Sequence, residues 1–370
     1  MDTWVGSKPG VAAIVRVVAT VSCLVALSWL LLASCGNAPV APPAGADTTN
    51  YDFTSTSYTI GEFTSILYDV AIVNDTLAYA VGEIYEHDEQ GEVIQPFYNI
   101  AKWDGRKWSV ERAKVLFQGD SITATLYGVF PLSPDDIWLS GGPPIHGDGT
   151  RWKVFDLVAM GILQQHDGSQ EKIWGREGHL YFAGSRGTVA YFDGENWKRI
   201  ETGTRVSIQD VWGATDPTTG EEVVLCAVSE IVTRSDHKIL RLYPDGRVDS
   251  IPWLRDKVIQ SIWFQGPGKI FTAGDGAFIR NGDGSWTDQS DVMPLGMNYS
   301  FCVRGQAEND VFVAMAYGGI SHFNGRSWRS WKDPFSLVYE RCAYKGDLFM
   351  AAGHTADQRG IVTIMRRIRK

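Results

Sequence analysis

The stretch KIWGREGHLYFAGSRGTVAYFDGENWKRI (172–200) decides the fold of this chain. It contains four short runs rich in β-branched and aromatic residues, each alternating in hydrophobicity with a period of two, and glycine-containing turns separate them. The last turn is Asp193-Gly194, a strong hairpin signal, because a type I′ turn needs positive φ at both central residues. The stretch therefore predicts one antiparallel sheet of four strands.

The closing DGxxW motif of this stretch recurs along the chain. The copies are KWDGRKW (102–108), HGDGTRW (146–152), NGDGSW (281–286), HFNGRSW (322–328) and, with its tryptophan lost, YPDGRVD (243–249). Four-stranded units repeated every 40–50 residues are typical of β-propellers. The repeats align as seven units whose first strands centre on Val70, Val129, Ile173, Val211, Ile262, Phe301 and Arg341. We therefore predict an all-β fold, a seven-bladed β-propeller with four-stranded antiparallel blades.

The last unit ends without a DGxxW motif and offers only three strands. An incomplete ring would leave strand edges unpaired. The segment YDFTSTSYTI (51–60) reads as a strand that precedes the first blade. We expect this N-terminal strand to complete blade seven and close the ring.

The first 50 residues have a different composition from the repeats. A basic start precedes an apolar run that ends in Leu32-Ala33-Ser34-Cys35, which resembles the bacterial lipoprotein signal. The resemblance implies a signal peptide over 1–34 and acylation of Cys35, followed by a Pro/Ala-rich tether over 35–50 and the propeller over 51–370. An uncleaved membrane anchor is the alternative, because the run from 17 to 34 has the length of a spanning helix.

The lipoprotein interpretation also predicts the location of the protein in the cell. The acylated cysteine would hold the protein in a lipid bilayer of the cell envelope. In Gram-negative lipoproteins, an aspartate directly after the cysteine retains the protein at the inner membrane. This chain has Gly36 at that position. The resemblance therefore implies the outer membrane if the source is Gram-negative.

The repeat consensus, (D/I)VWG followed by DGxxW, resembles the bacterial secreted propeller repeats of the VWAVG type over 66–370. The DGxxW turn also resembles the Asp-box of sialidases but lacks one residue between Asp and Gly. A general likeness to photosystem assembly propellers implies a partner-binding role. These resemblances indicate the fold and leave the function open, because propellers carry many activities.

Composition excludes several function classes. A formal net charge of -9 disfavours nucleic acid as a partner. The seven histidines form no zinc-ligand spacing, and no nucleotide or nucleophile motif is present, so we predict no metal and no cofactor. The turn aspartates are read as turn formers. Cys302 and Cys342 occupy equivalent slots in this alignment, and with Cys226 they are expected to be free thiols.

The connections between second and third strands are long in blades one, four and seven, and long insertions often mark a binding face. We expect a recognition surface where blades one and seven meet. Its candidate residues are Tyr85, Glu86, His87, Asp88, Tyr98, His354 and Arg359. Aromatic rings beside charges of both signs suit contact with a protein or a glycan.

Two functions remain open at this point. The first is a monomeric, membrane-anchored binding or scaffolding module for a protein or glycan at the cell envelope. The second is a propeller glycoside hydrolase or lyase acting on extracellular polysaccharide. The enzyme would need carboxylates and cations near the axis of the ring. Its candidates, at or just before the first strands, are Asp69, Lys172, Asp210 and Arg341.

Overall fold

The computed structural model describes residues 48–216, 219–253, 256–266, 268–295, 299–333 and 337–368. These residues belong to one compact unit that spans 41–370. They form seven four-stranded antiparallel sheets, which confirms the predicted seven-bladed propeller. The expected signal peptide and Cys35 lie outside the described residues. Within the described ranges, no helix is long and apolar enough to span a membrane.

Blades one to four follow the predicted order along the chain. Blade one comprises β2 (Ile66–Asn74), β3 (Leu77–Ile84), β4 (Tyr98–Trp103) and β5 (Trp108–Glu111). Blade two comprises β8 (Gly128–Ser133), β9 (Asp136–Ser140), β10 (Pro144–Gly147) and β11 (Trp152–Val154). Blade three comprises β12 (Gln170–Arg176), β13 (His179–Gly184), β14 (Val189–Phe192) and β15 (Trp197–Ile200). Blade four comprises β16 (Ile208–Thr215), β17 (Glu222–Glu230), β18 (Ser235–Leu242) and β19 (Val248–Ile251).

The remaining blades complete the ring. Blade five comprises β20 (Ile259–Phe264), β21 (Ile270–Gly274), β22 (Gly276–Arg280) and β23 (Trp286–Asp288). Blade six comprises β24 (Ser300–Ala307), β25 (Asp310–Met315), β26 (Gly319–Phe323) and β27 (Trp328–Lys332). Blade seven comprises β28 (Leu337–Lys345), β29 (Leu348–Thr355), β30 (Gly360–Ile368) and β1 (Asp52–Ile60). Two 3-10 turns, η1 (Ser185–Gly187) and η2 (Ser290–Val292), lie in connections.

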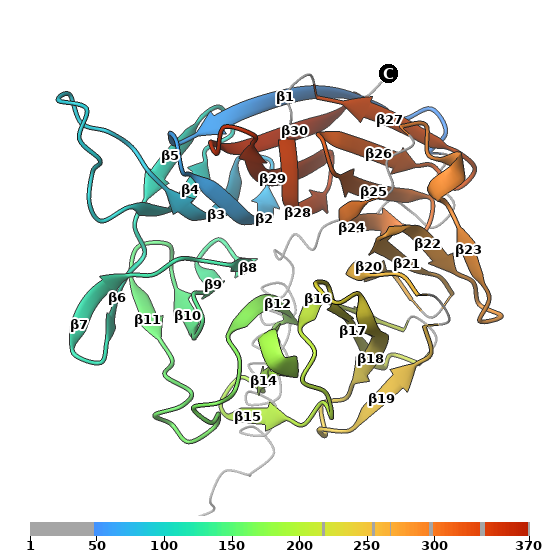
Figure 1. Ribbon diagram of the computed structural model, residues 1–370, viewed down its shortest axis with the longest axis horizontal. Coiled ribbons are helices and arrows are strands. Elements are labelled where there is room, and N and C mark those ends of the chain that lie inside the picture. Colours follow the sequence, from blue (N-terminus) through green and yellow to red (C-terminus); the bar gives the residue numbers. More distant parts are fainter. Residues whose placement is uncertain are drawn as a thin grey trace, which may run out of the picture. The chain divides into compact units, whose positions relative to one another are not determined.

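The first strands of successive blades contact one another, and β28 contacts β2, so the sheets form a ring with the first strands innermost (Figure 1). A small hairpin that the repeat alignment did not predict, β6 (Lys114–Phe117) and β7 (Asp120–Thr123), joins blades one and two. Its strand β6 contacts β11, the outermost strand of blade two.

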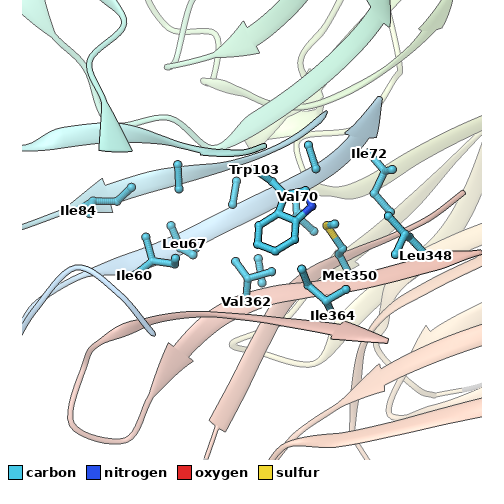
Figure 2. Packing of buried hydrophobic residues seen from close by; sticks show 14 residues of the cluster. Ile60, Leu67, Val70, Ile72, Ile84, Trp103, Leu348, Met350, Val362 and Ile364 are labelled. Atoms are coloured by element: carbon cyan, nitrogen blue, oxygen red, sulfur yellow. The ribbon is translucent and has the colours of Figure 1, made fainter. Parts of the chain in front are cut away.

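Strand β1 pairs with β30 in nine consecutive residue pairs, from Asp52 with Ile368 to Ile60 with Gly360. The outermost strand of blade seven thus comes from the start of the domain. Apolar side chains of β1 to β4 pack against those of β29 and β30 in one buried cluster, in which Trp103 lies near Met350 and Val362 (Figure 2). This cluster joins blades one and seven.

The Asp-Gly turns differ in type from the prediction. Only the glycine has positive φ, as in Gly105 (+93°) and Gly194 (+96°), and the preceding aspartate does not. The aspartate instead accepts hydrogen bonds from the backbone: Asp193 binds the N–H groups of Glu195 and Asn196 at 3.0 and 2.7 Å. The turn role of these aspartates is therefore correct, but the expected type I′ geometry is wrong, because the side chain stabilises a turn that needs one left-handed residue.

The glycine two residues after the strand centre, in VWG of blade four (211–213) and VRG of blade six (303–305), makes room for the preceding blade. A Cβ atom on Gly213 would lie 2.4–2.5 Å from the ring of Trp174, and one on Gly305 would lie 2.8–2.9 Å from the ring of Trp263. The tryptophan of one blade therefore packs directly on the backbone of the next. This packing explains why tryptophan and glycine occur together in the repeat.

Candidate functional site

A β-bulge in the first strand sets which side chains approach the next blade near the axis of the ring. Six of the seven first strands shift register at the same place, between Leu67 and Asp69 in blade one and at the matching positions of blades three to seven. At the position after the bulge, or its equivalent in blade two, the blades carry Asp69, Gly128, Lys172, Asp210, Ser261, Cys302 and Arg341. We call these seven residues the inner ring.

The bulge corrects the repeat alignment in blades six and seven. Cys302 matches Arg341 of the inner ring and not Cys342, and the strand centres are Val303 and Cys342 in place of Phe301 and Arg341. The position after the strand centre accordingly holds Arg304 in blade six, where blades three to five hold tryptophan. A bulge leaves no mark in a hydrophobic pattern, so sequence alone placed blade six two residues and blade seven one residue out of register.

Inner-ring side chains bind the backbone of the neighbouring blade. The acceptors and their N–H donors are Asp69 from Val129 (3.0 Å), Asp210 from Ile262 (3.1 Å), Ser261 from Val303 (3.1 Å) and Cys302 from Cys342 (3.0 Å). The two aspartates also accept the N–H of the next residue in their own strand. The inner ring is therefore a set of bonds between blades.

The three cysteines of the described residues are free thiols, as predicted, and all are buried. Cys302 and Cys342 do not occupy the equivalent slots that the repeat alignment gave them. Their actual offset brings the sulfur of Cys302 to 3.0 Å from the backbone nitrogen of Cys342.

Asp210 forms the strongest ion pair of the inner ring. The Arg304 guanidinium donates to both carboxylate oxygens, at 2.8 and 3.0 Å, and lies over the ring of Trp212 at 4.8 Å. Asp210 is 2% exposed. Burial opposes its ionisation, but Arg304 outweighs burial and lowers the pKa of Asp210.

The cations of the inner ring are also engaged. Arg341 is buried and donates to the carbonyl oxygens of Glu340 (2.8 Å) and Gln209. Burial and the charge of Arg341 lower the pKa of Lys172 to about 8, while Asp69 acts in the opposite sense. The structure thus brings Asp69, Lys172, Asp210 and Arg341 into one electrostatic network, as the enzyme hypothesis requires.

The two carboxylates of this network have structural partners. Asp69 accepts two backbone N–H groups, and Asp210 accepts two N–H groups, a hydroxyl and a bidentate guanidinium. A general acid or base must be able to reach the substrate. The arrangement therefore favours a structural role for both carboxylates.

The blade-seven candidates have partners within their own blade. The ring of His354 approaches Glu340 of β28 at 3.7 Å, and this carboxylate raises the pKa of His354. Arg359 pairs with Asp357 in the exposed β29–β30 turn at 3.2 Å. His354 therefore faces the first strand, whereas Arg359 lies in the turn.

The blade-one candidates lie in the long connection between β3 and β4, residues 85–97, which extends away from the ring in Figure 1. His87 pairs with Glu62 at 2.5 Å. Asp88 accepts the N–H groups of Gln90 and Glu92, both at 2.9 Å, and so fixes the turn of the connection. Two of the candidates thus stabilise the loop.

The aromatic candidates lie at the base of this loop. Tyr85 donates its hydroxyl to Glu83 at 3.3 Å and packs against Phe97, and the guanidinium of Arg112 lies 3.7 Å from the ring of Tyr98. Glu86 is partly exposed, and its carbonyl accepts the N–H of Ile94. Within the described residues, no hydrogen bond, ion pair or ring contact joins these residues to His354 or Arg359.

A feature that the sequence did not reveal lies in the turns between second and third strands. The connections of blades four and seven, predicted to be long, are also tight turns (231–234 and 356–359), because their strands extend further than expected. Four of these turns place a residue other than glycine in the left-handed region: Arg186 (φ 55°), Arg234 (φ 53°), Tyr317 (φ 55°) and Gln358 (φ 54°). All four are exposed. The sequences SRG and YGG signal tight turns, but they do not show which residue takes the positive φ.

Comparisons with known proteins support the fold. Neither protein-family models nor curated protein sequences gave a match. Among solved structures, virginiamycin B lyase from Staphylococcus aureus is similar with a TM-score of 0.61 and 9% identity, covering 86% of this chain and 100% of that one. YCF48 bound to D1 peptide has a TM-score of 0.59 and 14% identity, covering 84% and 96%. The WD40 propeller domain of Doa1 has a TM-score of 0.60 and 11% identity, covering 86% and 97%.

Proposed function

We propose that this protein is a lipid-anchored binding module whose propeller contacts a protein or glycan partner at the cell envelope. The contact surface is the face that carries the connections between second and third strands. We call it the connection face. It includes the left-handed turns and, by topology, the candidates in 85–97 and Arg359.

The left-handed turns are the observation that carries this proposal. A residue with a Cβ atom in this region costs about 1 kcal/mol relative to glycine. Glycine does take the positive φ in the equivalent turns of blades two and five, at Gly142 and Gly276. Arginine and tyrosine in the same turns are the residue types that dominate binding interfaces. We infer that these side chains are retained for contact at the expense of stability.

Two of the structurally similar proteins are precedents, one for binding and one for catalysis by this fold. One is described as bound to a peptide, and another is a lyase. The present chain provides exposed arginine and tyrosine side chains, while Asp69 and Asp210 are occupied by structural bonds. This contrast favours binding over catalysis.

The test is a screen of the full-length protein in detergent against envelope proteins and glycans. The triple variant Arg186→Gly/Arg234→Gly/Tyr317→Gly should lose at least tenfold in affinity. Its stability should change by no more than about 1 kcal/mol, because loss of the Arg234–Asp275 ion pair offsets the relief of the left-handed backbone. The matched control replaces Arg106, Glu195 and Arg326 with alanine, in turns on the opposite face. Equal binding by the triple variant and the wild type, or loss only in the control, would refute the proposal.

The anchor is a separate part of the proposal and has its own test. Cys35 should be the acylated first residue of the processed chain. Intact-mass analysis of a Cys35→Ala variant should show loss of the lipid mass, and the protein should leave the membrane fraction. Retention in the membrane without lipid would favour an uncleaved anchor.

A further inference from the structure

A polar pocket of about 700 Å³ lies on the connection face at blade three. Three connections form its walls: the η1 turn and the segments that join β11 to β12 and β15 to β16. The lining residues are His166, Asp167, Arg186, Gly187, Arg199, Ile200, Glu201, Thr202, Gly203, Thr204 and Arg205.

The pocket gathers positive charge in a chain whose formal net charge is -9. Of its three arginines, Arg199 is paired with both lining acids, Asp167 at 3.0 Å and Glu201 at 3.3 Å. Arg186 and Arg205 are exposed and form no ion pair with any residue that the structure describes. Two guanidinium groups therefore remain available at the pocket.

Arg186 is held in place from both ends. Its backbone takes the left-handed conformation in η1, and its guanidinium donates to the carbonyl oxygen of His166 at 2.9 Å. The bond uses one nitrogen atom of the guanidinium and leaves the others to bind an anion. Because the side chain is already oriented, binding would require little further loss of side-chain entropy.

The walls of the pocket pack closely against each other. A Cβ atom on Gly187 would lie 2.3 Å from the carbonyl oxygen of Thr204, so only glycine fits where the two connections meet. The hydroxyl of Thr202 donates to the carbonyl of Gly187 at 2.7 Å. These contacts fix the segment that carries Arg205 relative to the turn that carries Arg186.

We propose that this pocket binds the carboxylate of an acidic saccharide through Arg186 and Arg205. The inference rests on the proposed binding face and specifies its ligand class. Guanidinium groups match the planar geometry of a carboxylate. The lining has a single large apolar side chain, Ile200, and otherwise offers polar groups and backbone, which suits a ligand rich in hydroxyl groups.

The experiment is calorimetric titration of the full-length protein in detergent with four probes: an oligosaccharide of uronic acids, a neutral oligosaccharide of equal length, inorganic phosphate and sulfate. We expect saturable binding of the uronic acid oligosaccharide alone, weaker at high salt because the contact is ionic. Arg186→Gly and Arg205→Gln should each reduce its affinity at least fivefold. The control Arg326→Gln changes an exposed arginine in a turn of the opposite face and should bind like the wild type.

Several results would overturn the inference. They are no saturable binding by the wild type, equal binding of the neutral oligosaccharide, binding of phosphate or sulfate as tight as that of the uronic acid, and full binding by the Arg186→Gly/Arg205→Gln variant. Arg205 is absent from the triple variant that tests the binding face. Its effect therefore separates failure of this pocket from failure of the proposed function.

Discussion

Replacing Asp210 with alanine tests whether the inner ring holds the propeller together. The carboxylate is buried and accepts hydrogen bonds from Arg304, from the hydroxyl of Ser261 at 2.5 Å, and from the backbone N–H groups of Val211 and Ile262. These partners come from three successive blades. The substitution therefore removes an anion that connects blades four, five and six.

The expected loss follows from what the substitution leaves behind. The carboxylate raises the pKa of Arg304, which stays charged in the variant with only neutral partners. Removing one member of a buried ion pair typically costs 3–5 kcal/mol, because the other charge remains desolvated. We expect Asp210→Ala to lower the free energy of unfolding by about 4 kcal/mol, measured by denaturant titration.

A double-mutant cycle separates the ion pair from general damage. Arg304→Met should also be strongly destabilising, because it leaves the carboxylate buried without its cation. The double variant Asp210→Ala/Arg304→Met removes both charges and should be more stable than either single variant. A loss below about 1 kcal/mol in Asp210→Ala would refute the structural role, since such a value is typical of solvated ion pairs. Asp210 would then be available for acid–base chemistry.

The loss of stability at acid pH gives an independent measure of the Asp210–Arg304 ion pair. The pKa of Asp210 in the folded protein lies below its usual value of 3.8, because Arg304 outweighs burial. A depressed pKa contributes stability at neutral pH, and that stability is lost as the pH falls below about 4 and through the folded pKa. The Asp210→Asn variant cannot titrate at this position, so its stability should fall less steeply in acid than that of the wild type.

Three further predictions concern the ring. Deleting 51–60 should lower the melting temperature by roughly 10 °C, because β30 loses its partner strand. Deleting 36–46 should change the melting temperature little. Equal melting temperatures for the two deletions would contradict closure of the ring by β1. The second deletion ends before Thr48, which is buried and donates to two backbone carbonyls. Thiol titration of the unfolded, unreduced, processed protein should count three free cysteines in the domain, and a lower count would reveal a disulfide. Gly213→Ala should lower the free energy of unfolding by about 1–3 kcal/mol, because the added methyl group meets the ring of Trp174. In the control Gly282→Ala the added methyl group would lie 3.5 Å from its nearest neighbour, so the stability should hardly change. Similar losses in the two variants would exclude this packing.

The repeat pattern was sufficient to predict the blades because each blade repeats the same local chemistry. An Asp-Gly or Asn-Gly turn recurs at one place in six of the seven units, and in five of them a tryptophan follows it, which leaves a strong mark in sequence. The correct position of Cys302 was not predictable, because the bulge that precedes it alters no hydrophobic pattern. Arg304 was missed for the same reason.

The candidate site was harder to predict, because the sequence does not show whether a charged side chain in a loop is free or bound to a neighbour. His87 and Asp88 were selected as charged residues of a long loop, and the structure shows each bound to a neighbour within the domain. Arg186 and Arg205 occur in short, ordinary connections, and only the folded chain brings them to one pocket. Loop length was therefore a poor guide to free binding groups.

The charged residues fall into two groups, those of the inner ring and those of the connection face. Substitutions in the two groups should have different effects on stability and binding. Inner-ring charges such as Asp210 are buried and neutralised, so changing them should alter stability first. Charges of the connection face such as Arg186 are exposed and held in turns that glycine would occupy at lower energy. A substitution that raises stability and lowers binding is possible only in the second group. That combination, measured on one variant, would assign function to the connection face, because loss of binding through misfolding would lower both quantities together.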